Sequence, residues 1–333
     1  MFTKATVFGT GAMGTVMAQV LAANGLQVAL LATRPERVQE LLISKENTRY
    51  LPGVHLAASV RPTADARAAL AHTELIISAL PTQYLRNGLS AIQSHIPPGV
   101  PVCSVTKGIE LETWKRPSDV LREFVPRSPV AVLSGPSIAP ELAKCLPTTV
   151  VIACADGDVA RTMQESLSTS WFRVYTNNDI IGVELAGALK NVIALAAGIL
   201  DGLRAGDNAK AALVTRGLVE ITRLGVAMGG RRETFIGLAG VGDLVTTCTS
   251  PHGRNRSAGE RIGSGVSVED VMRESASVIE GIPTTRAALA LATERGIEMP
   301  ITEAVSRVLF DGTAPLDAIT SLMQRPLRSE GNY

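Results

Sequence analysis

A single lysine in an apolar helical stretch is the first residue of this chain that could do acid–base chemistry. Lys190 lies between Glu184 and Asp201, and no other charged residue occurs in that interval. An ammonium on such a helix either reaches water or is held by a partner. Desolvation in a dry cleft makes its proton easier to lose, which suits a general acid or base. From this segment alone, a solvated lysine at the polar edge of an amphipathic helix is slightly favoured.

The second candidate for chemistry is a glycine-rich loop near the N-terminus. Gly9-Thr10-Gly11-Ala12-Met13-Gly14 fits the pattern G-x-G-x-x-G, follows an apolar run at 6–8 and opens a helical pattern. In such loops the glycines allow a tight turn, close approach of a pyrophosphate and close packing of helix on strand. The helix N-terminus offers N–H groups to the phosphates. The loop predicts a dinucleotide site, with a merely tight turn as the minor alternative.

A basic residue follows the next apolar run. Arg34 lies 20 residues beyond Gly14, where NAD-binding proteins usually carry Asp or Glu for the ribose 2′-hydroxyl. A cation there suits a 2′-phosphate, which favours NADPH. Glu36 is close enough to leave NADH open, and a solvated arginine near a helix start is the alternative for Arg34.

The elements that must position these residues follow from hydrophobic patterning. Short apolar runs predict strands at 6–8, 28–31, 75–80, 102–105, 130–133, 148–153 and 172–175. Continuous rather than alternating hydrophobicity is typical of parallel strands covered on both faces, and alternation with helices indicates an open doubly wound α/β sheet. Beyond 179 the periodicity is helical. We expect a Rossmann-type dinucleotide-binding domain at 1–178 and an all-helical substrate-binding domain at 179–333.

Composition excludes several classes of protein. Hydrophobic residues make up 46% of the chain and the net charge is +1, so a globular protein without nucleic-acid partners is expected. Four scattered cysteines without CxxC spacing and four histidines make a structural metal site improbable and favour reduced, mostly buried thiols. No signal peptide is evident, and no uninterrupted apolar run reaches the ~20 residues that span a bilayer. A cytoplasmic protein without integral membrane association is expected.

Further segments carry residues suited to binding an anion. Lys107 follows the run at 102–105, at the sheet edge where doubly wound folds bind ligands. The small residues of 134–139 would let backbone approach a ligand. Gly242-Asp243, followed by Gly253-Arg254-Asn255-Arg256, suits a pocket for a small polyol phosphate, since guanidinium binds phosphate in bidentate fashion. Each segment alone could be an ordinary turn.

In this order and spacing, the segments resemble the NAD(P)-dependent glycerol-3-phosphate dehydrogenase family over nearly the whole chain. The matching elements are the glycine loop and segments 106–108, 134–137, 184–191, 242–244 and 253–256, of which Ala-Leu-Lys-Asn and Arg-Asn-Arg are the most specific. The resemblance implies reversible reduction of dihydroxyacetone phosphate to sn-glycerol 3-phosphate with NADPH, or with NADH as a possible cofactor. It further implies a supply of glycerophospholipid precursor and a homodimer.

The resemblance also implies roles for individual residues. Lys190 is expected to donate the proton to the C2 carbonyl oxygen, Lys107 to polarise that carbonyl, and Asp243 to hold substrate and orient Lys190. The expected substrate-binding residues are Lys107, Gly135, Ser137, Lys190, Asp243, Thr247, Gly253, Arg254 and Asn255. The expected cofactor-binding residues are Gly9, Thr10, Gly11, Ala12, Met13, Gly14, Arg34, Lys107, Ala139, Arg254, Val278 and Glu280.

Two residues depart from the pattern of the family, and two alternative functions remain open. Met13 stands where bacterial members often have an aromatic residue, and Gly253 where they often have serine. A neighbouring β-hydroxyacid dehydrogenase or ketopantoate reductase would share the fold and a helical lysine, but Gly-Arg-Asn-Arg favours a phosphate-bearing substrate. A catalytically dead nucleotide sensor on the same fold would be expected to lack Lys107 or Lys190, and both are present.

Overall fold

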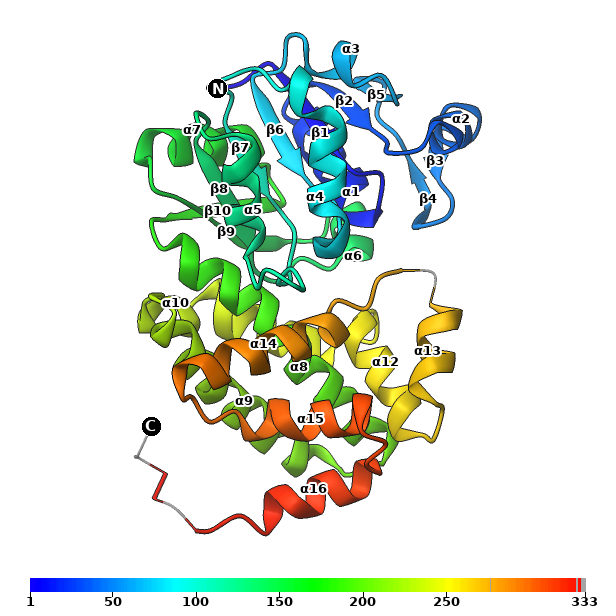
Figure 1. The fold of residues 1–333 in the computed structure, drawn as a ribbon. Coiled ribbons are helices and arrows are strands. Elements are labelled where there is room, and N and C mark those ends of the chain that lie inside the picture. Colours follow the sequence, from blue (N-terminus) through cyan, green and yellow to red (C-terminus); the bar gives the residue numbers. More distant parts are fainter. Residues whose placement is uncertain (276, 328, 331–333) are drawn as a thin grey trace. The chain divides into compact units, whose positions relative to one another are not determined.

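The computed structural model describes residues 1–275, 277–327 and 329–330, and Figure 1 shows their arrangement. Residue contacts divide the chain into a sheet unit, Met1–Lys107 with Arg116–Ile180, and a helical unit, Gly108–Lys115 with Ile181–Tyr333. The predicted division at 178/179 lies two residues before the last change of unit. Nothing in the sequence pattern indicated that Gly108–Lys115 would group with the helical unit.

The sheet unit is built on an eight-stranded sheet of order β10-β9-β8-β7-β6-β1-β2-β5. Its strands are β1 (Lys4–Phe8), β2 (Gln27–Leu31), β5 (Val60–Thr63), β6 (Leu75–Ser78), β7 (Val102–Ser104), β8 (Val130–Ser134), β9 (Thr148–Cys154) and β10 (Phe172–Asn177). The six strands from β5 to β8 run parallel, whereas β9 pairs antiparallel with β8, and β10 parallel with β9. The six parallel strands have the order of a Rossmann sheet, which confirms the predicted fold class.

Successive residues of the central strands serve two separate cores. Val7, Ile77 and Cys103 pair across three strands and belong to the core that holds α1 (Ala12–Ala23) and α7 (Gly157–Leu167). Their neighbours Ile76 and Val102 belong to the core that holds α4 (Thr82–Ile92) and α5 (Pro117–Phe124). Side chains alternate across a strand, so a sheet with helices on both faces needs apolar residues at consecutive positions. This is the physical reason for the continuous apolar runs in the sequence.

The remaining elements of the sheet unit are short. They are α2 (Pro35–Ser44), α3 (Ala66–Leu70), η1 (Gln93–His95), α6 (Ala139–Ala143) and the antiparallel pair β3 (Glu46–Asn47) and β4 (Leu51–His55). The apolar pattern predicted none of the strands β3, β4 and β5. Pro52 and Pro62 lie inside two of those strands and weaken the strand signal.

From Ile180 onward the described residues, colored from green to red in Figure 1, form helices and one π-helical turn. They are α8 (Ile180–Gly202), α9 (Asp207–Ala227), α10 (Arg232–Ile236), η2 (Leu238–Gly242), α11 (Asp243–Thr249), α12 (Arg254–Gly263), α13 (Val268–Glu274), α14 (Gly281–Arg295), α15 (Pro300–Phe310) and α16 (Pro315–Met323). The prediction of an all-helical second part is confirmed for these residues.

Helix α8 is the core helix of this unit. It is long and apolar enough to cross a membrane by length and composition, but 94% of its most apolar window is buried inside the protein. That burial is typical of a central helix in a globular unit and explains why the helix is apolar on all sides.

Helices α8 and α12 touch through their backbones. A Cβ added at Gly198 would lie 1.9 Å from the Arg256 carbonyl oxygen, and one at Gly202 would lie 2.2 Å from that of Glu260. In return, a Cβ at Gly259 would lie 2.1 Å from the Leu195 carbonyl oxygen. Only glycine permits such close approach. The contact fixes the start of α12 against the helix that carries Lys190.

Candidate active site

The glycine loop has the three-part geometry expected of a pyrophosphate site. Gly9 has φ +120°, and a Cβ there would lie 2.8 Å from the Ala79 carbonyl oxygen. A Cβ on Gly14 would lie 1.9 Å from the Gly9 carbonyl oxygen, whereas Gly11 has no atom within 4 Å of that direction. The outer glycines are thus required by packing, and the middle one leaves open space beside the N-terminus of α1. The loop therefore fits a dinucleotide phosphate.

Other predicted cofactor residues lie on the same unit. Arg34 is exposed and lies three residues after the end of β2, just before α2. The last residue of β2, Leu31, contacts the glycine loop, because its carbonyl oxygen accepts the Gly9 N–H at 3.0 Å. Arg34 therefore follows a strand end that touches the loop, while its contact with a 2′-phosphate stays a prediction. Ala139 is partly buried and begins α6.

Lys107 is held against the loop that follows β8. Its Nζ donates to the Gly135 carbonyl oxygen at 3.0 Å and to Ser137 Oγ at 3.2 Å. Ser137 Oγ also donates to the Gly135 oxygen at 2.9 Å. Since β7 and β8 are adjacent and parallel, the residues after them emerge at one sheet edge. The structure thus brings together three of the predicted substrate residues.

Lys190 is buried and held by partners, which excludes the solvated-lysine interpretation. Its side chain is only 6% exposed, and Nζ lies 2.5 Å from Asp243 Oδ1 on α11. Nζ also donates to Thr247 Oγ1, one turn further along, and that hydroxyl donates to the Asp243 carbonyl oxygen at 2.7 Å. The threonine oxygen is therefore left as an acceptor facing the ammonium. A carboxylate and a hydroxyl fix the orientation of the ammonium.

The turn before Asp243 explains how the carboxylate reaches the lysine. Residues Leu238–Gly242 form a π-helical turn, and a Cβ on Gly240 would overlap the Phe235 carbonyl oxygen at 1.8 Å. Such turns often occur at functional sites. Beside the pair, burial raises the pKa of the Cys248 thiol to about 12, although Lys190 opposes the shift. This cysteine therefore stays protonated and fills space.

The predicted phosphate clamp divides into one exposed and one buried residue. Arg254 is exposed and opens α12, whose first turn has no acidic residue and no side-chain cap. A helix N-terminus with an arginine in its first turn suits a phosphate.

Asn255 instead links three helices. Its Nδ2 donates to Asn191 Oδ1 at 2.9 Å, and its Oδ1 accepts the backbone N–H of Gly281 at 2.9 Å. This amide joins α12 to α8 and to the start of α14, next to the predicted cofactor residues Val278 and Glu280. Binding of the substrate phosphate by Asn255 stays a prediction. In addition, the structure shows that Asn255 holds α12 against α8 and the start of α14.

Sequence reasoning missed the use of Arg256, the second arginine of the motif. Its Nη1 lies 2.5 Å from Asp201 Oδ2, its Nη2 2.9 Å from Glu260 Oε2, and its Nε donates to the Ser250 carbonyl oxygen. The bond to Asp201 anchors the start of α12 to α8. Only the position after Asn255 in the motif could have drawn attention to Arg256.

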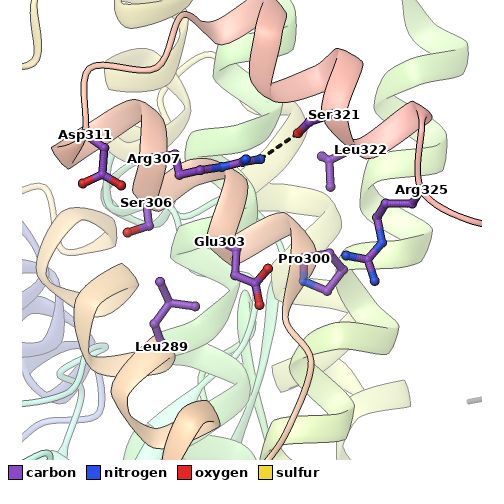
Figure 2. Close-up of a pocket in the computed structure, with 9 residues that line it drawn as sticks. All are labelled: Leu289, Pro300, Glu303, Ser306, Arg307, Asp311, Ser321, Leu322 and Arg325. Carbon is purple, nitrogen blue, oxygen red and sulfur yellow. Dashed lines mark hydrogen bonds between the residues drawn. The ribbon is translucent and has the colours of Figure 1, made fainter.

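A cavity of 460 Å³ lies elsewhere in the helical unit, and Figure 2 shows its lining. It lies among α14, α15 and α16 and mixes Arg307 and Arg325 with Glu303 and Asp311. Arg307 Nη2 donates to Ser321 Oγ at 2.6 Å across it. None of the predicted site residues lines this cavity, so it is separate from the predicted active site.

A Rossmann sheet with a pyrophosphate loop, on a chain with a buried lysine–carboxylate pair, defines the class of nicotinamide-dependent oxidoreductases. Family models of the N-terminus and C-terminus of NAD-dependent glycerol-3-phosphate dehydrogenase match residues 4–160 and 179–320. The chain belongs to this family. Because this match covers both units, the sequence-level resemblance is confirmed.

Similar proteins support the same assignment. Glycerol-3-phosphate dehydrogenase [NAD(P)+] of Moorella thermoacetica is 49% identical over 97% of this chain and 96% of its own length. The enzyme of that name from Chlorobium phaeobacteroides is 48% identical over 99% of this chain and 100% of its own. A crystal structure of glycerol-3-phosphate dehydrogenase from Coxiella burnetii has a TM-score of 0.93 and 37% identity, covering 97% of this chain and 99% of that one.

The similarity to a ketopantoate reductase, one of the alternatives, is a similarity of fold alone. A ketopantoate reductase from Ralstonia eutropha has 16% identity and a TM-score of 0.59, with 95% of this chain and 99% of that chain covered. That similarity is too distant to carry an activity across. The family assignment therefore decides between the two dehydrogenase hypotheses.

Proposed function

We propose that this oxidoreductase catalyses the reversible reduction of dihydroxyacetone phosphate to sn-glycerol 3-phosphate with NADPH, or NADH, as reductant. The buried Lys190–Asp243–Thr247 cluster, on a chain of this family, carries the proposal. The glycine loop supports the cofactor, since Gly11 leaves open space at the N-terminus of α1. When bound, the nicotinamide supplies the hydride for C2 of the substrate.

The helical unit supplies the proton. As C2 gains hydride, the carbonyl π pair moves to oxygen, and the Lys190 ammonium gives that oxygen a proton and becomes a neutral amine. Asp243 stabilises the ammonium before transfer, and Thr247 orients it. In the reverse direction the neutral amine takes the hydroxyl proton as hydride leaves C2. A fixed ammonium at a developing alkoxide is an electrostatic stabiliser that costs no reorganisation.

Two further groups bind the substrate and cofactor in this proposal. Arg254 and the first turn of α12 hold the phosphate, because charge and helix dipole act together there. Lys107, fixed by Gly135 and Ser137, polarises the carbonyl and contacts the cofactor. Arg34 favours the 2′-phosphate of NADPH, with Glu36 nearby leaving NADH usable.

The setting of the reaction belongs to the same proposal. The product carries the glycerol phosphate backbone of glycerophospholipids, so we assign the protein to their supply. Three buried cysteines and one exposed cysteine, all free, are consistent with a reducing cytoplasm. The homodimer is proposed from the family resemblance.

The test is NADPH oxidation with dihydroxyacetone phosphate by the wild type and by Lys190→Ala. Loss of a general acid lowers kcat by about 10²–10⁴-fold, while NADPH binding measured by fluorescence stays intact. Pure, folded wild type that binds NADPH but turns over no substrate would refute the activity. Arg34→Ala tests the cofactor assignment separately: NADPH affinity should fall and NADH affinity should not, and unchanged NADPH affinity would refute the role of Arg34.

A further inference from the structure

One buried asparagine holds the carbonyl side of the glycine loop. Asn47, in β3, is 0% exposed. Its Nδ2 donates to the Thr10 carbonyl oxygen at 2.9 Å and to Thr15 Oγ1 at 2.8 Å. Thr15 Oγ1 in turn donates to the Gly11 carbonyl oxygen at 3.0 Å. Two consecutive loop carbonyls are thus tied to a single amide and the hydroxyl it contacts.

These bonds fix the direction in which the loop presents its N–H groups. A peptide unit is planar and trans, so its C=O and N–H point to opposite sides. With the Thr10 oxygen held by Asn47, the N–H of Gly11 must point away from β3. Around Gly11 no atom meets an added Cβ within 4 Å. Backbone N–H groups with open space beside them are what a pyrophosphate needs.

A buried arginine fixes the orientation of that amide. Arg37 Nη2 donates to Asn47 Oδ1 at 2.9 Å, and the guanidinium lies 5.3 Å from the centre of the Tyr50 ring. A guanidinium can only donate, so it selects the amide oxygen and turns Nδ2 toward the loop. Arg37 is 9% exposed and comes from α2, the helix that begins just after Arg34. Helix α2, which begins next to the predicted 2′-phosphate site, is therefore linked to the glycine loop by the hydrogen bonds of Arg37 and Asn47.

We propose that Asn47 is a positioning residue for the cofactor pyrophosphate and that Arg37 orients it. Neither residue belongs to the glycine motif, and neither was expected from sequence. The inference deepens the proposed function, since it rests on the use of NADPH. It assigns part of the affinity for the pyrophosphate to a side chain that never touches the cofactor.

The test is Asn47→Asp, which keeps the shape and the pairing with Arg37 but turns a donor into an acceptor. The new carboxylate oxygen repels the Thr10 carbonyl and releases the loop peptide. The Kd for NADPH, measured by fluorescence titration, should rise about 10- to 100-fold. This factor corresponds to the binding free energy of one hydrogen bond to a charged ligand. The kcat at saturating NADPH should stay within about twofold, because hydride and proton transfer are untouched.

A second ligand separates positioning from general damage. Adenosine 2′-monophosphate carries the ribose phosphate without a pyrophosphate, so its affinity should be the same in the wild type and in Asn47→Asp. Equal weakening of both ligands would mean a disordered domain and would overturn the proposal. Unchanged NADPH affinity would overturn it too. Wild type that fails to bind NADPH at all would instead refute the cofactor assignment.

Asn24 offers a matched control on the same unit. Its Nδ2 also donates to two carbonyl oxygens, those of Ser166 at 3.0 Å and Ser168 at 2.9 Å, at the opposite end of α1. Asn24→Asp should lower the melting temperature without changing the Kd for NADPH. If Asn47→Asp does not fold, two other variants serve instead, because Thr15→Val and Arg37→Lys each disrupt one contact in the series of hydrogen bonds from Arg37 to the glycine loop. Each should raise the Kd about three- to tenfold, and an unchanged Kd in both would overturn the proposal.

Discussion

The chemistry of Lys190 comes from residues distant in sequence rather than from its own helix. Asp243 and Thr247 lie more than fifty positions away and meet the ammonium only in the folded unit. This is why the helix alone left a solvated lysine as the favoured interpretation. Family resemblance, and not periodicity, predicted the Asp243 contact from sequence. Asn47 and Arg256 went unpredicted because a lone polar residue in a sequence does not reveal its burial.

Thr247→Val tests the orientation of the ammonium. Valine keeps the shape and removes the acceptor for Nζ, so the lysine should remain paired with Asp243 but be less well aligned. We expect kcat to fall about 10- to 100-fold, in line with one hydrogen bond to a charged group at ~1.5–3 kcal/mol. Steady-state kinetics across pH measure the effect, with a larger change in kcat than in the KM for NADPH.

Thr249→Val is the control, because this exposed threonine donates to the Val245 carbonyl oxygen from the same helix, away from Lys190. Its kcat should match the wild type within about twofold. Equal losses in the two variants would indicate that α11 itself is damaged.

The hydrophobic pattern predicted most strands, because a strand in the centre of the sheet has buried apolar residues on both faces and therefore appears as a continuous apolar run. The runs at 102–105 and 130–133, for example, correspond to β7 and β8. The short β3–β4 pair was missed because it lacks the apolar pattern of the sheet core, and β5 because Pro62 interrupts it. The antiparallel direction of β9 was not predicted, since apolar runs carry no direction. The backbone contact of α8 with α12 was missed too, because a glycine within a helical pattern usually indicates a less stable helix and not a close contact between two helices.

Gly259→Ala tests that contact. The added methyl would lie 2.1 Å from the Leu195 carbonyl oxygen, so α12 must shift away from α8. Overpacking of this kind costs about 1–3 kcal/mol. The shift moves Arg254, so the KM for dihydroxyacetone phosphate should rise by a larger factor than the Kd for NADPH, whose glycine loop lies outside the helical unit.

Denaturant unfolding and kinetics measure the two effects of Gly259→Ala. Gly157→Ala is the comparison, since its added Cβ meets nothing within 4 Å. Gly259→Ala with wild-type stability and wild-type KM would contradict the packing argument.

Glu220→Gln tests how α9 holds the start of α15. The Glu220 oxygens accept the backbone N–H groups of Ile301 and Thr302, both at 2.8 Å, and the Thr302 hydroxyl. An amide NH₂ would face one of those donors, so the variant should be destabilised by about 1–3 kcal/mol.

The effect of Glu220 should also depend on pH. Burial, the largest cause, raises the pKa of this carboxyl above its usual 4.5 despite the three hydrogen bonds. The folded state then binds the proton more tightly than the unfolded state, so this contribution is complete below about pH 4.5 and is lost as pH rises through the folded pKa. The difference in unfolding free energy between wild type and variant should therefore be smaller at pH 8 than at pH 5. A constant or growing difference would contradict the raised pKa.

For the chain as a whole, the cofactor should act as a stabiliser. A ligand that binds only the folded state adds about 2.7 kcal/mol at 100 times its Kd. We expect NADPH to raise the temperature of the unfolding transition that involves the sheet unit, and desalting to reverse the shift. Calorimetry with adenosine in place of NADPH is the control. No shift at saturating NADPH would contradict binding to the folded glycine loop.

The division of the chain has a consequence for dissecting the protein into fragments. The backbone passes from one unit to the other after Lys107, after Lys115 and after Ile180, so no single cut separates the units. A recombinant fragment ending at 178 would carry Gly108–Lys115 without the helices it groups with. Ile109, 0% exposed in the intact protein, would then face water. Such a fragment should aggregate, whereas a chain nicked at 180/181 should stay associated through this eight-residue insertion and co-elute as one particle.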